Sequence, residues 1–481
     1  MGFRALGLDI GTSAVKGVVF ECAPGEPPRP LARASRPQTL EVPHPGWAEQ
    51  DPDRTLALVE QVLQELEPWI PSLRAVGLSG AMHSLLPVDE ALRPLGRAIT
   101  WADGRAAEQA LRLRRSQPGL ADRTGTPLHP MAWPAKLMWL REHQPEIFSR
   151  ARYFLGIKEY ILARWGLWPP CMDASMASGT GLYDIHREQW DPALVESLSA
   201  GGERLPVVVA TTSRHSTGRL PVPLAPGGGD GPLSNLGTGS TGPGQAAVSV
   251  GTSGALRVCT SGPVPTGNGC IFCYNLAPRR WVAGGAISNG TLVLNWLSDL
   301  FGAPHEELLQ AATEVPPGAE GLTVLPYLAG ERSPHWNPKA RGVLFGLGLH
   351  HGRGHLVRAF MEGVCFALKD VHRNLPEQLR AIQEFRATGG FTRSRIWVQM
   401  LADVLGSRVA LPSETEAGAM GAALLALAED IGLETAMDCA SRIRVAESFA
   451  PQPGPSRIYR EGFERYRALY PALEPQFPGP G

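Results

Sequence analysis

Two similar segments, half a chain apart, constrain this fold more than any other feature of the sequence. The first runs from Leu6 to Phe20 and the second from Ala247 to Val258. Each is a run of apolar and β-branched residues broken by Gly-Thr-Ser, a pattern that predicts a β-hairpin. The alternative is a coincidence between two short hairpins. A repeated element at this spacing indicates two similar lobes, and 481 residues are too many for one ordinary core.

The rest of the chain alternates between helical and strand-like patterns. Apolar residues recur at helical spacing in residues 54–66, 135–142, 159–165, 355–372, 394–405 and 417–427, and short apolar strands are expected at 75–78, 85–88 and 385–388. Strands interleaved with helices are typical of the α/β class. A stretch rich in glycine and proline, Pro221–Gly244, separates the halves and is expected to form loops or a hinge.

The composition excludes several classes of protein. With a formal net charge of −1, no overall field attracts nucleic acid or an anionic membrane. No run of 18 apolar residues exists to span a membrane. The cysteines number seven, an odd count at irregular spacing, which indicates a reducing cytoplasm rather than a disulfide framework. Cys270 and Cys273 form a lone CxxC, for which a metal or redox role is disfavoured.

The two Gly-Thr-Ser turns are the candidate phosphate sites, because the chain has no Walker lysine loop. A tight turn without bulky side chains exposes backbone N–H groups, and the hydroxyls of Thr and Ser add donors. Asp9, just before the first turn, is expected to hold Mg²⁺ through water. Lys16, on the returning strand, is within reach of a transferring phosphate. The alternative for each turn is a plain hairpin.

Two later segments suit a nucleotide. The strand at 385–388 ends in Gly389 and Gly390, after which a Thr/Ser pair is expected to cap the next helix. The start of a helix after paired glycines allows a nucleotide to lie against the backbone, although an ordinary loop has the same pattern. The small residues from Ala417 to Ala423 let a helix or a flat ring approach closely, and alone they are more often simple packing.

Asp230 is the candidate catalytic base. It stands among the glycines of Gly227–Gly231, and Asp-Gly is usually only turn chemistry. Phosphoryl transfer, however, needs positioning, a metal and a group that accepts the proton of the nucleophile. A carboxylate at the junction of the two halves would be that group.

Together these segments resemble the FGGY family of carbohydrate kinases. Asp9–Ser13 and Val250–Ser253 resemble the two phosphate hairpins of that family, and Gly228–Gly231 resembles the loop that carries its catalytic aspartate. Further matches are Thr388–Gly390 with Trp397–Asp403 for the adenosine segment, and Gly342–Leu347 with His355–Glu362 for the C-terminal signature. The matches follow the expected order from residue 6 to residue 427.

The resemblance implies an α/β fold with two actin/hexokinase-like (ribonuclease H-like) lobes and a cleft between them. We expect a sugar-binding lobe at residues 1–235, a nucleotide-binding lobe at 236–445 and a tail at 446–481. The implied protein is a cytoplasmic kinase that uses ATP and Mg²⁺ on a small sugar or sugar acid. Nucleic acid and membrane are not expected partners, and a homodimer is left open.

The resemblance also assigns roles to individual residues. Nucleotide contacts are expected at Gly11, Thr12, Ser13, Gly251, Thr252, Gly290, Gly389, Gly390, Ser394 and Ala417. Sugar contacts are expected at Met82, His83, Trp101, Asp103 and Arg105, with Asp230 as the base and Asp9 at the metal.

Within the family, several stretches look most similar to bacterial gluconate kinases. These are Ser79–Leu85, Thr100–Arg105, Thr124–Pro130, Asp230–Gly237 and Leu328–Asn337. They imply phosphorylation of D-gluconate to 6-phospho-D-gluconate. The carboxylate of such a substrate calls for a cation, for which Arg105, Lys158 and Arg332 are candidates.

Two positions qualify this choice of substrate. Xylulose kinases show a similar pattern, usually with glycine where this chain has Ser84. Trp133 replaces a smaller residue or proline in the family signature around Lys136, and it is expected to reshape a wall of the sugar site.

Three alternatives remain open at this stage. The first is a kinase of the same fold that acts on xylulose or another sugar. The second is an actin-fold ATPase that drives a protein partner, and the third is a sugar-binding regulator without catalytic activity. The sequence retains Asp9, Asp230 and both Gly-Thr-Ser turns, which argues against the third.

Overall fold

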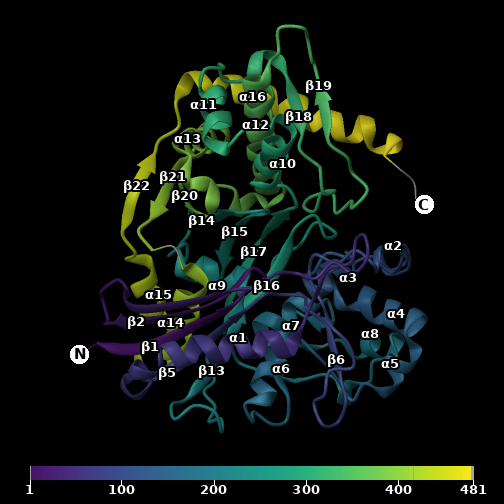
Figure 1. Cartoon of the computed structure of the whole chain (residues 1–481), viewed down its shortest axis with the longest axis vertical. Helices are drawn as coiled ribbons and strands as arrows, with labels where there is room; N and C mark the ends of the chain where they lie inside the picture. Colours follow the sequence, from purple (N-terminus) through teal and green to yellow (C-terminus); the bar gives the residue numbers. More distant parts are fainter. Residues whose placement is uncertain (1, 415, 478–481) are drawn as a thin grey trace. The chain divides into compact units, whose positions relative to one another are not determined.

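The computed structural model describes residues 2–414 and 416–477 (Figure 1). Residues 478–481 of the expected tail lie outside this description. The chain forms two compact units, each assembled from three segments. Unit 1 contains Met1–Gly242, Cys259–Ala283 and Glu416–Ile443, and unit 2 contains Pro243–Val258, Gly284–Thr415 and Arg444–Gly481.

Unit 1 is built on a five-stranded sheet in the order β13-β5-β1-β2-β3. Its strands are β1 (Phe3–Ile10), β2 (Ala14–Cys22), β3 (Arg29–Pro37), β5 (Ala75–Gly80) and β13 (Leu224–Gly229). The antiparallel pair β1–β2 encloses the first Gly-Thr-Ser turn, so the predicted hairpin is confirmed. β5 runs parallel to β1 and places Ser79 beside Asp9.

Alternation along β1 and β2 divides the interior of unit 1 into two cores. One face, with Leu8 and Val15, packs with Val59 of α1 (Pro52–Glu65). The other, with Ala5 and Phe20, packs with α14 (Ala417–Ile431). Figure 1 shows α14 and α15 (Leu433–Ser441), in yellow-green, beside the purple strands β1 and β2. A helix from late in the sequence therefore covers one face of the N-terminal sheet.

Small residues bring α14 close to its neighbours. A Cβ atom on Gly7 would lie 1.8 Å from the carbonyl oxygen of Ala419, and one on Gly421 would lie 2.2 Å from that of Leu233 in α9 (Asp230–Gly237). No side chain larger than hydrogen fits at such distances. The small residues expected at 417–423 therefore serve close packing within unit 1.

Most of the smaller elements of unit 1 come from the part of the sequence between β5 and β13. They are β4 (Glu49–Gln50), η1 (Glu67–Ser72), β6 (Leu86–Val88), β7 (Ala98–Ile99), α2 (Ala107–Ser116), α3 (Leu120–Thr124), α4 (Trp133–His143), α5 (Pro145–Arg150), β8 (Tyr153–Leu155), α6 (Ile157–Arg164), β9 (Cys171–Asp173), α7 (Ala174–Thr180), β10 (Tyr183–Asp184), β11 (Gln189–Trp190), α8 (Pro192–Ser197), η2 (Gly202–Arg204), β12 (Val207–Val209) and β16 (Phe272–Ala277). The helices predicted at 54–66, 135–142 and 159–165 are confirmed as α1, α4 and α6.

A seven-stranded sheet in the order β16-β17-β15-β14-β20-β21-β22 contains most of the strands of unit 2. The strands not yet defined are β14 (Gln245–Val250), β15 (Gly254–Thr260), β17 (Arg280–Ile287), β20 (Glu384–Thr388), β21 (Arg408–Pro412) and β22 (Val445–Phe449). β14 and β15 form the second predicted hairpin, and β20 runs parallel to β14. The arrangement β5-β1-β2 thus recurs as β20-β14-β15, which confirms the internal repeat.

The remaining elements of unit 2 are mostly helical. They are α10 (Leu292–Phe301), α11 (His305–Thr313), η3 (Ala319–Gly321), β18 (Thr323–Leu325), β19 (Val343–Phe345), α12 (Arg353–Asn374), η4 (Glu377–Leu379), η5 (Gly390–Arg393), α13 (Arg395–Leu405), α16 (Pro453–Leu473) and η6 (Glu474–Gln476). The expected tail therefore begins with part of β22 and continues as α16, whose Tyr459, Phe463 and Tyr466 are buried. No described helix combines the length and the apolar composition needed to cross a membrane.

The interpretation of Pro221–Gly244 as loops or a hinge is wrong for residues 224–237 and confirmed as loop only at its two ends. Leu224–Gly229 is the fully buried strand β13, and Asp230 is the first residue of α9 rather than part of a turn. Gly227 is needed because β13 passes close to β5 at this residue. Gly227 has a φ of +71°, and a Cβ atom there would lie 1.9 Å from the carbonyl oxygen of Leu78.

Candidate functional site

Asp9 lies at the centre of a polar cluster in unit 1. The Ser79 hydroxyl donates to Asp9 Oδ1 at 2.7 Å, and a Cβ atom on Gly418 would lie 2.9 Å from Oδ2. Burial raises the pKa of Asp9 to about 6, an effect that the bond from Ser79 opposes and the nearby charge of Asp230 reinforces. The predicted metal ligand and the predicted base therefore act on each other electrostatically.

The first Gly-Thr-Ser turn is supported from behind by Gln38. The backbone N–H of Gln38 donates to the Ser13 carbonyl at 3.0 Å, and its side-chain amide donates to the Gly11 carbonyl. These bonds hold the carbonyls of Gly11 and Ser13 against Gln38. Of the predicted phosphate donors, Thr12 is partly exposed and Ser13 is exposed.

Lys16 is paired with Glu416, a residue that the sequence analysis missed. Lys16 Nζ donates to Glu416 Oε2 at 2.8 Å. The two residues are 400 positions apart, and no local pattern joins them. A charged residue directly before the small-residue helix that begins at Ala417 is the one signal that could have drawn attention to Glu416.

In unit 2, the second turn is bonded to the segment that precedes α10. The Gly290 N–H donates to the Thr252 carbonyl at 2.9 Å, and the Thr291 N–H donates to the Gly251 carbonyl at 2.6 Å. A Cβ atom on Gly290 would lie 2.3 Å from the Gly251 oxygen, so the two segments touch.

The paired glycines after β20 reach the same place. Gly389 has a φ of +103°, and a Cβ atom there would lie 2.4 Å from the Val250 carbonyl oxygen. A Cβ atom on Gly390 would lie 3.9 Å from the methyl group of Thr291. The structure thus gathers the following predicted nucleotide residues in unit 2: Gly251, Thr252, Gly290, Gly389 and Gly390.

Ser394 and Ala417 differ from the other predicted nucleotide residues. Ser394 precedes α13, but its side chain makes no capping hydrogen bond, so that part of the expectation is wrong. Its Oγ is buried and has no hydrogen-bond partner among the residues that the structure describes. Ala417 begins α14 and belongs to unit 1.

A buried carboxyl group, missed in the sequence, supports the segment that leads to Gly290. Glu331 Oε1 accepts hydrogen bonds from the backbone N–H groups of Ser288 at 2.6 Å and Arg332 at 2.7 Å. Burial raises the pKa of Glu331 to about 7, against the effect of these bonds.

Met82 and His83, the predicted sugar contacts, lie in unit 1 near the start of α9. A Cβ atom on Gly229, the residue before Asp230, would lie 2.6 Å from Met82 Sδ. His83 Nδ1 lies 2.7 Å from the Gly179 carbonyl oxygen. Because a carbonyl only accepts, the proton of a neutral His83 is on Nδ1.

Asp103 and Arg105 form an internal ion pair. Arg105 Nε and Nη2 donate to the two oxygens of Asp103 at 2.8 and 2.7 Å, and Nη2 also donates to Glu49 at 2.5 Å. The guanidinium lies 3.6 Å from the ring centre of Trp47. Trp101 precedes this pair in a segment anchored by the bond from the Leu85 N–H to the Ile99 carbonyl, 2.9 Å long.

All three candidate cations for a substrate carboxylate donate hydrogen bonds within the protein. Arg105 has the partners just described. Buried Lys158 donates to Asp173 and to the carbonyls of Pro226 at 2.9 Å and Gly228 at 3.2 Å, which uses all three N–H groups of an ammonium. Arg332 belongs to unit 2, where it donates to the Ile287 carbonyl at 2.8 Å.

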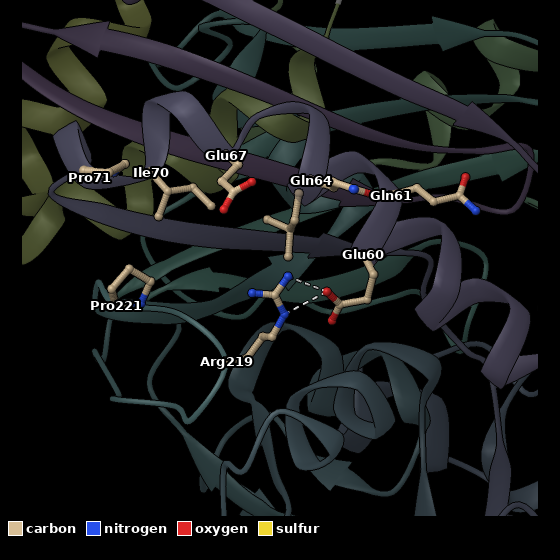
Figure 2. A pocket seen from close by; sticks show the side chains of 9 residues that line it. Glu60, Gln61, Gln64, Glu67, Ile70, Pro71, Arg219 and Pro221 are labelled. Atoms are coloured by element: carbon tan, nitrogen blue, oxygen red, sulfur yellow. Dashed lines mark hydrogen bonds and ion pairs between the residues drawn. The ribbon is translucent and has the colours of Figure 1, made fainter.

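One pocket of the protein lies away from these residues. It has a volume of about 410 Å³ and is lined by α1, η1 and the loop with Arg219 and Pro221. Figure 2 shows Arg219 pointing across it to Glu60, to which it is ion-paired at 2.5 Å. A second pocket of about 270 Å³ has Arg105, Glu49 and Trp47 in its wall.

Comparison with known proteins identifies the family. The model of the N-terminal domain of the FGGY family of carbohydrate kinases matches residues 4–237, and that of the C-terminal domain matches residues 246–429. The chain is 35% identical to a gluconokinase from Bacillus licheniformis over 98% of this chain and 96% of that protein.

Solved structures agree with this similarity. A xylulose kinase from Lactobacillus acidophilus has a TM-score of 0.91 at 29% identity, covering 98% of this chain and 99% of that one. A gluconate kinase from the same organism has a TM-score of 0.90 at 29% identity, covering 98% of each chain. The expected α/β fold of two actin/hexokinase-like domains is thereby confirmed. This chain belongs to the FGGY family of carbohydrate kinases.

Proposed function

We propose that the chain transfers the γ-phosphoryl group of ATP to the terminal hydroxyl of a sugar acid, with D-gluconate as substrate and 6-phospho-D-gluconate as product. The observation that supports this most directly is the position of Asp230. Its neighbour Gly229 touches Met82, and its charge acts on partly buried Asp9. The residues proposed as base, sugar contact and metal ligand thus lie within one unit.

In the proposed reaction, Asp230 accepts the proton of the attacking hydroxyl. The carboxylate is the first residue of α9, and its Oδ1 accepts the Gly231 N–H at 2.9 Å. That bond orients the plane of the carboxylate and therefore both of its oxygens. General-base catalysis of this kind contributes on the order of 10²–10⁴-fold to the rate.

The proposed donors to the phosphates of ATP are Gly11, Thr12 and Ser13, together with Gly251 and Thr252. The adenosine would lie against Gly290, Gly389, Gly390, Ser394 and Ala417. Asp9 fits Mg²⁺, because it is a hard oxygen donor and the negative charge of Asp230 acts on it, although the charge of Lys16 opposes this effect. The bound ion would neutralise charge on the phosphates.

The similarity to gluconate kinases supports gluconate, but a xylulose kinase is equally similar in structure. Ser84, the position that separates the two groups in sequence, accepts the Ile157 N–H on its hydroxyl at 3.1 Å. Its side chain is buried and bonds the first residue of α6. Xylulose is therefore the second candidate substrate.

The test is coupled ADP release with ATP and Mg²⁺ in the presence of gluconate, xylulose, ribulose or glycerol, with a blank that lacks sugar. We expect gluconate to give the highest kcat/KM. A higher kcat/KM for xylulose would mean that xylulose is the substrate, and Asp230 would remain the proposed base. Equal ADP release with and without sugar would contradict sugar phosphorylation and favour an ATPase that acts on a protein partner.

A further inference from the structure

The turn that carries Met82 and His83 has a conformation that needs support. His83 has a φ of +69°, in the left-handed region that residues with a Cβ atom rarely adopt. Such backbone persists only where the surrounding structure holds it. The turn lies between β5 and β6, and its residue Met82 touches Gly179 and Gly229.

One face of α4 supplies that support. Lys136 Nζ donates to the His83 carbonyl at 2.5 Å, and Trp133 Nε1 donates to the Ser84 carbonyl at 2.9 Å. Lys136 and Trp133 are three positions apart, so they project from the same side of the helix. Two successive carbonyls of the turn are therefore held by two side chains of one helix.

Lys136 also joins this turn to the segment before Trp101. Its Nζ donates to the carbonyls of Ile99 at 3.1 Å and Thr100 at 2.9 Å. With the bond to His83, all three N–H groups of the ammonium are used. A single group thus fixes the backbone next to three of the predicted sugar contacts: Met82, His83 and Trp101.

The chemistry of this contact is unusual for a structural group. Lys136 is fully buried, and the acceptors of its hydrogen bonds are carbonyls rather than carboxylates. The charged groups that act on it are Asp103 and Arg105, which have opposite effects. Burying such a charge is unfavourable unless it is well bonded, so stability alone does not explain it.

We propose that Trp133 and Lys136 are positioning residues that fix the Met82–Ser84 turn and the Ile99–Thr100 segment and thereby set the affinity for the sugar. This inference rests on the proposed function, because it takes Met82, His83 and Trp101 as sugar contacts. Trp133, which departs from the family signature, thereby acquires a specific role, because its indole N–H holds Ser84.

The test compares Trp133→Phe and Lys136→Met with wild type. Phe keeps an aromatic ring and removes the N–H. Trp190→Phe is the matched control, because Trp190 Nε1 also donates to a backbone carbonyl, that of Pro206, at 2.9 Å. We measure KM for the sugar and for ATP, and amide hydrogen exchange at residues 82–85.

We expect Trp133→Phe and Lys136→Met to raise the KM for the sugar by roughly tenfold, since a buried carbonyl loses its donor. The KM for ATP should stay close to that of wild type, and amide exchange at 82–85 should accelerate. Trp190→Phe should change none of these. If Lys136→Met does not fold, Trp133→Phe alone decides.

Unchanged sugar KM and unchanged exchange at 82–85 in Trp133→Phe would overturn the proposal. A similar rise in both KM values with faster exchange throughout the chain would also overturn it, because it indicates a general loss of structure. If wild type phosphorylates no sugar, the proposed function fails. Amide exchange at residues 82–85 then remains as the test of whether Trp133 and Lys136 position the turn. Local acceleration would then support positioning of the turn, and no acceleration would refute it.

Discussion

At the scale of single residues, Asp230 carries the clearest prediction. Asp230→Asn keeps the shape of the side chain and removes its basicity. We expect kcat to fall by roughly 10²–10⁴-fold, while the midpoint of thermal unfolding stays close to that of wild type, because the side chain is partly exposed at the start of α9. Steady-state kinetics and calorimetry on the same preparation test this. Near-normal turnover would remove Asp230 from the role of base.

Lys136 gives a second prediction at this scale, on stability. Burial lowers the pKa of Lys136 from 10.5 to about 7. Between these values the unfolded chain binds the proton and the folded chain does not, so this lysine makes stability rise with pH by about 1.4 kcal/mol per unit. Below the folded pKa its unfavourable effect is complete and constant.

Urea unfolding of wild type and Lys136→Met from pH 6 to pH 9 checks this linkage. Methionine does not titrate, so the difference in free energy of unfolding isolates the lysine. We expect wild type to gain on the variant as pH rises above about 7. Parallel curves would mean that Lys136 keeps its proton throughout.

The sequence reveals residues of the site better than it reveals their partners. Asp9, Thr12 and Asp230 stand in short motifs that local pattern makes visible. Ser79, which bonds Asp9, lies 70 positions away, and Glu416, which bonds Lys16, lies 400 positions away. Such pairs depend on the register of strands and on the packing of α14, and neither is a property of a local segment.

At the scale of elements, amphipathic periodicity predicted the helices well. The glycine content of a segment was a poor guide to its structure. Residues 355–372 and 395–405 are helical as expected, in α12 and α13. β13 was missed because its three glycines, which usually signal turns, are needed for close contacts: Gly227 with β5, Gly228 with Ser175 and Gly229 with Met82. A glycine can be required by the backbone conformation of a turn or by a neighbouring segment that leaves no room for a Cβ atom. A single sequence does not distinguish these two causes.

Gly421→Ala tests the close packing of α14. A Cβ atom at this position would lie 2.2 Å from the backbone oxygen of Leu233, which cannot move without shifting α9. We expect a loss of about 1–3 kcal/mol or more in the free energy of unfolding. This loss should exceed the gain in helix propensity, which is at most about 1 kcal/mol.

Gly454→Ala is the matched control, because Gly454 lies in α16 and a Cβ atom there has no neighbour within 4 Å. It should leave stability unchanged or raise it slightly. Urea unfolding of both variants gives the comparison. Equal effects of the two substitutions would mean that α14 has room to adjust.

At the scale of the whole molecule, the repeat predicted two lobes but not how the chain builds them. The hairpin followed by a parallel strand appears in both sheets. Each unit, however, takes three separate segments of the chain. The boundaries expected at residues 235 and 445 remain predictions, and a linear boundary does not describe how α14 joins unit 1.

This assembly predicts that the N-terminal part of the chain does not fold alone. A fragment of residues 1–283 contains two of the three segments of unit 1 and lacks Glu416–Ile443. It would expose the face of the sheet that α14 covers, including Ala5, Val18 and Phe20, which are buried in the whole chain. With this face exposed to water, the fragment loses the burial of apolar surface that drives the folding of unit 1.

We expect this fragment to show no cooperative unfolding transition by tryptophan fluorescence in urea. Joining residues 416–443 to it through a flexible linker should restore a sigmoidal transition, because the helix then covers the face that its absence exposed. A linked segment of the same composition in scrambled order is the control. If the fragment alone unfolds with the midpoint of the joined form, α14 does not complete the core of unit 1. A transition only with the native order would show that a contact between distant segments, rather than the N-terminal sequence alone, determines this fold.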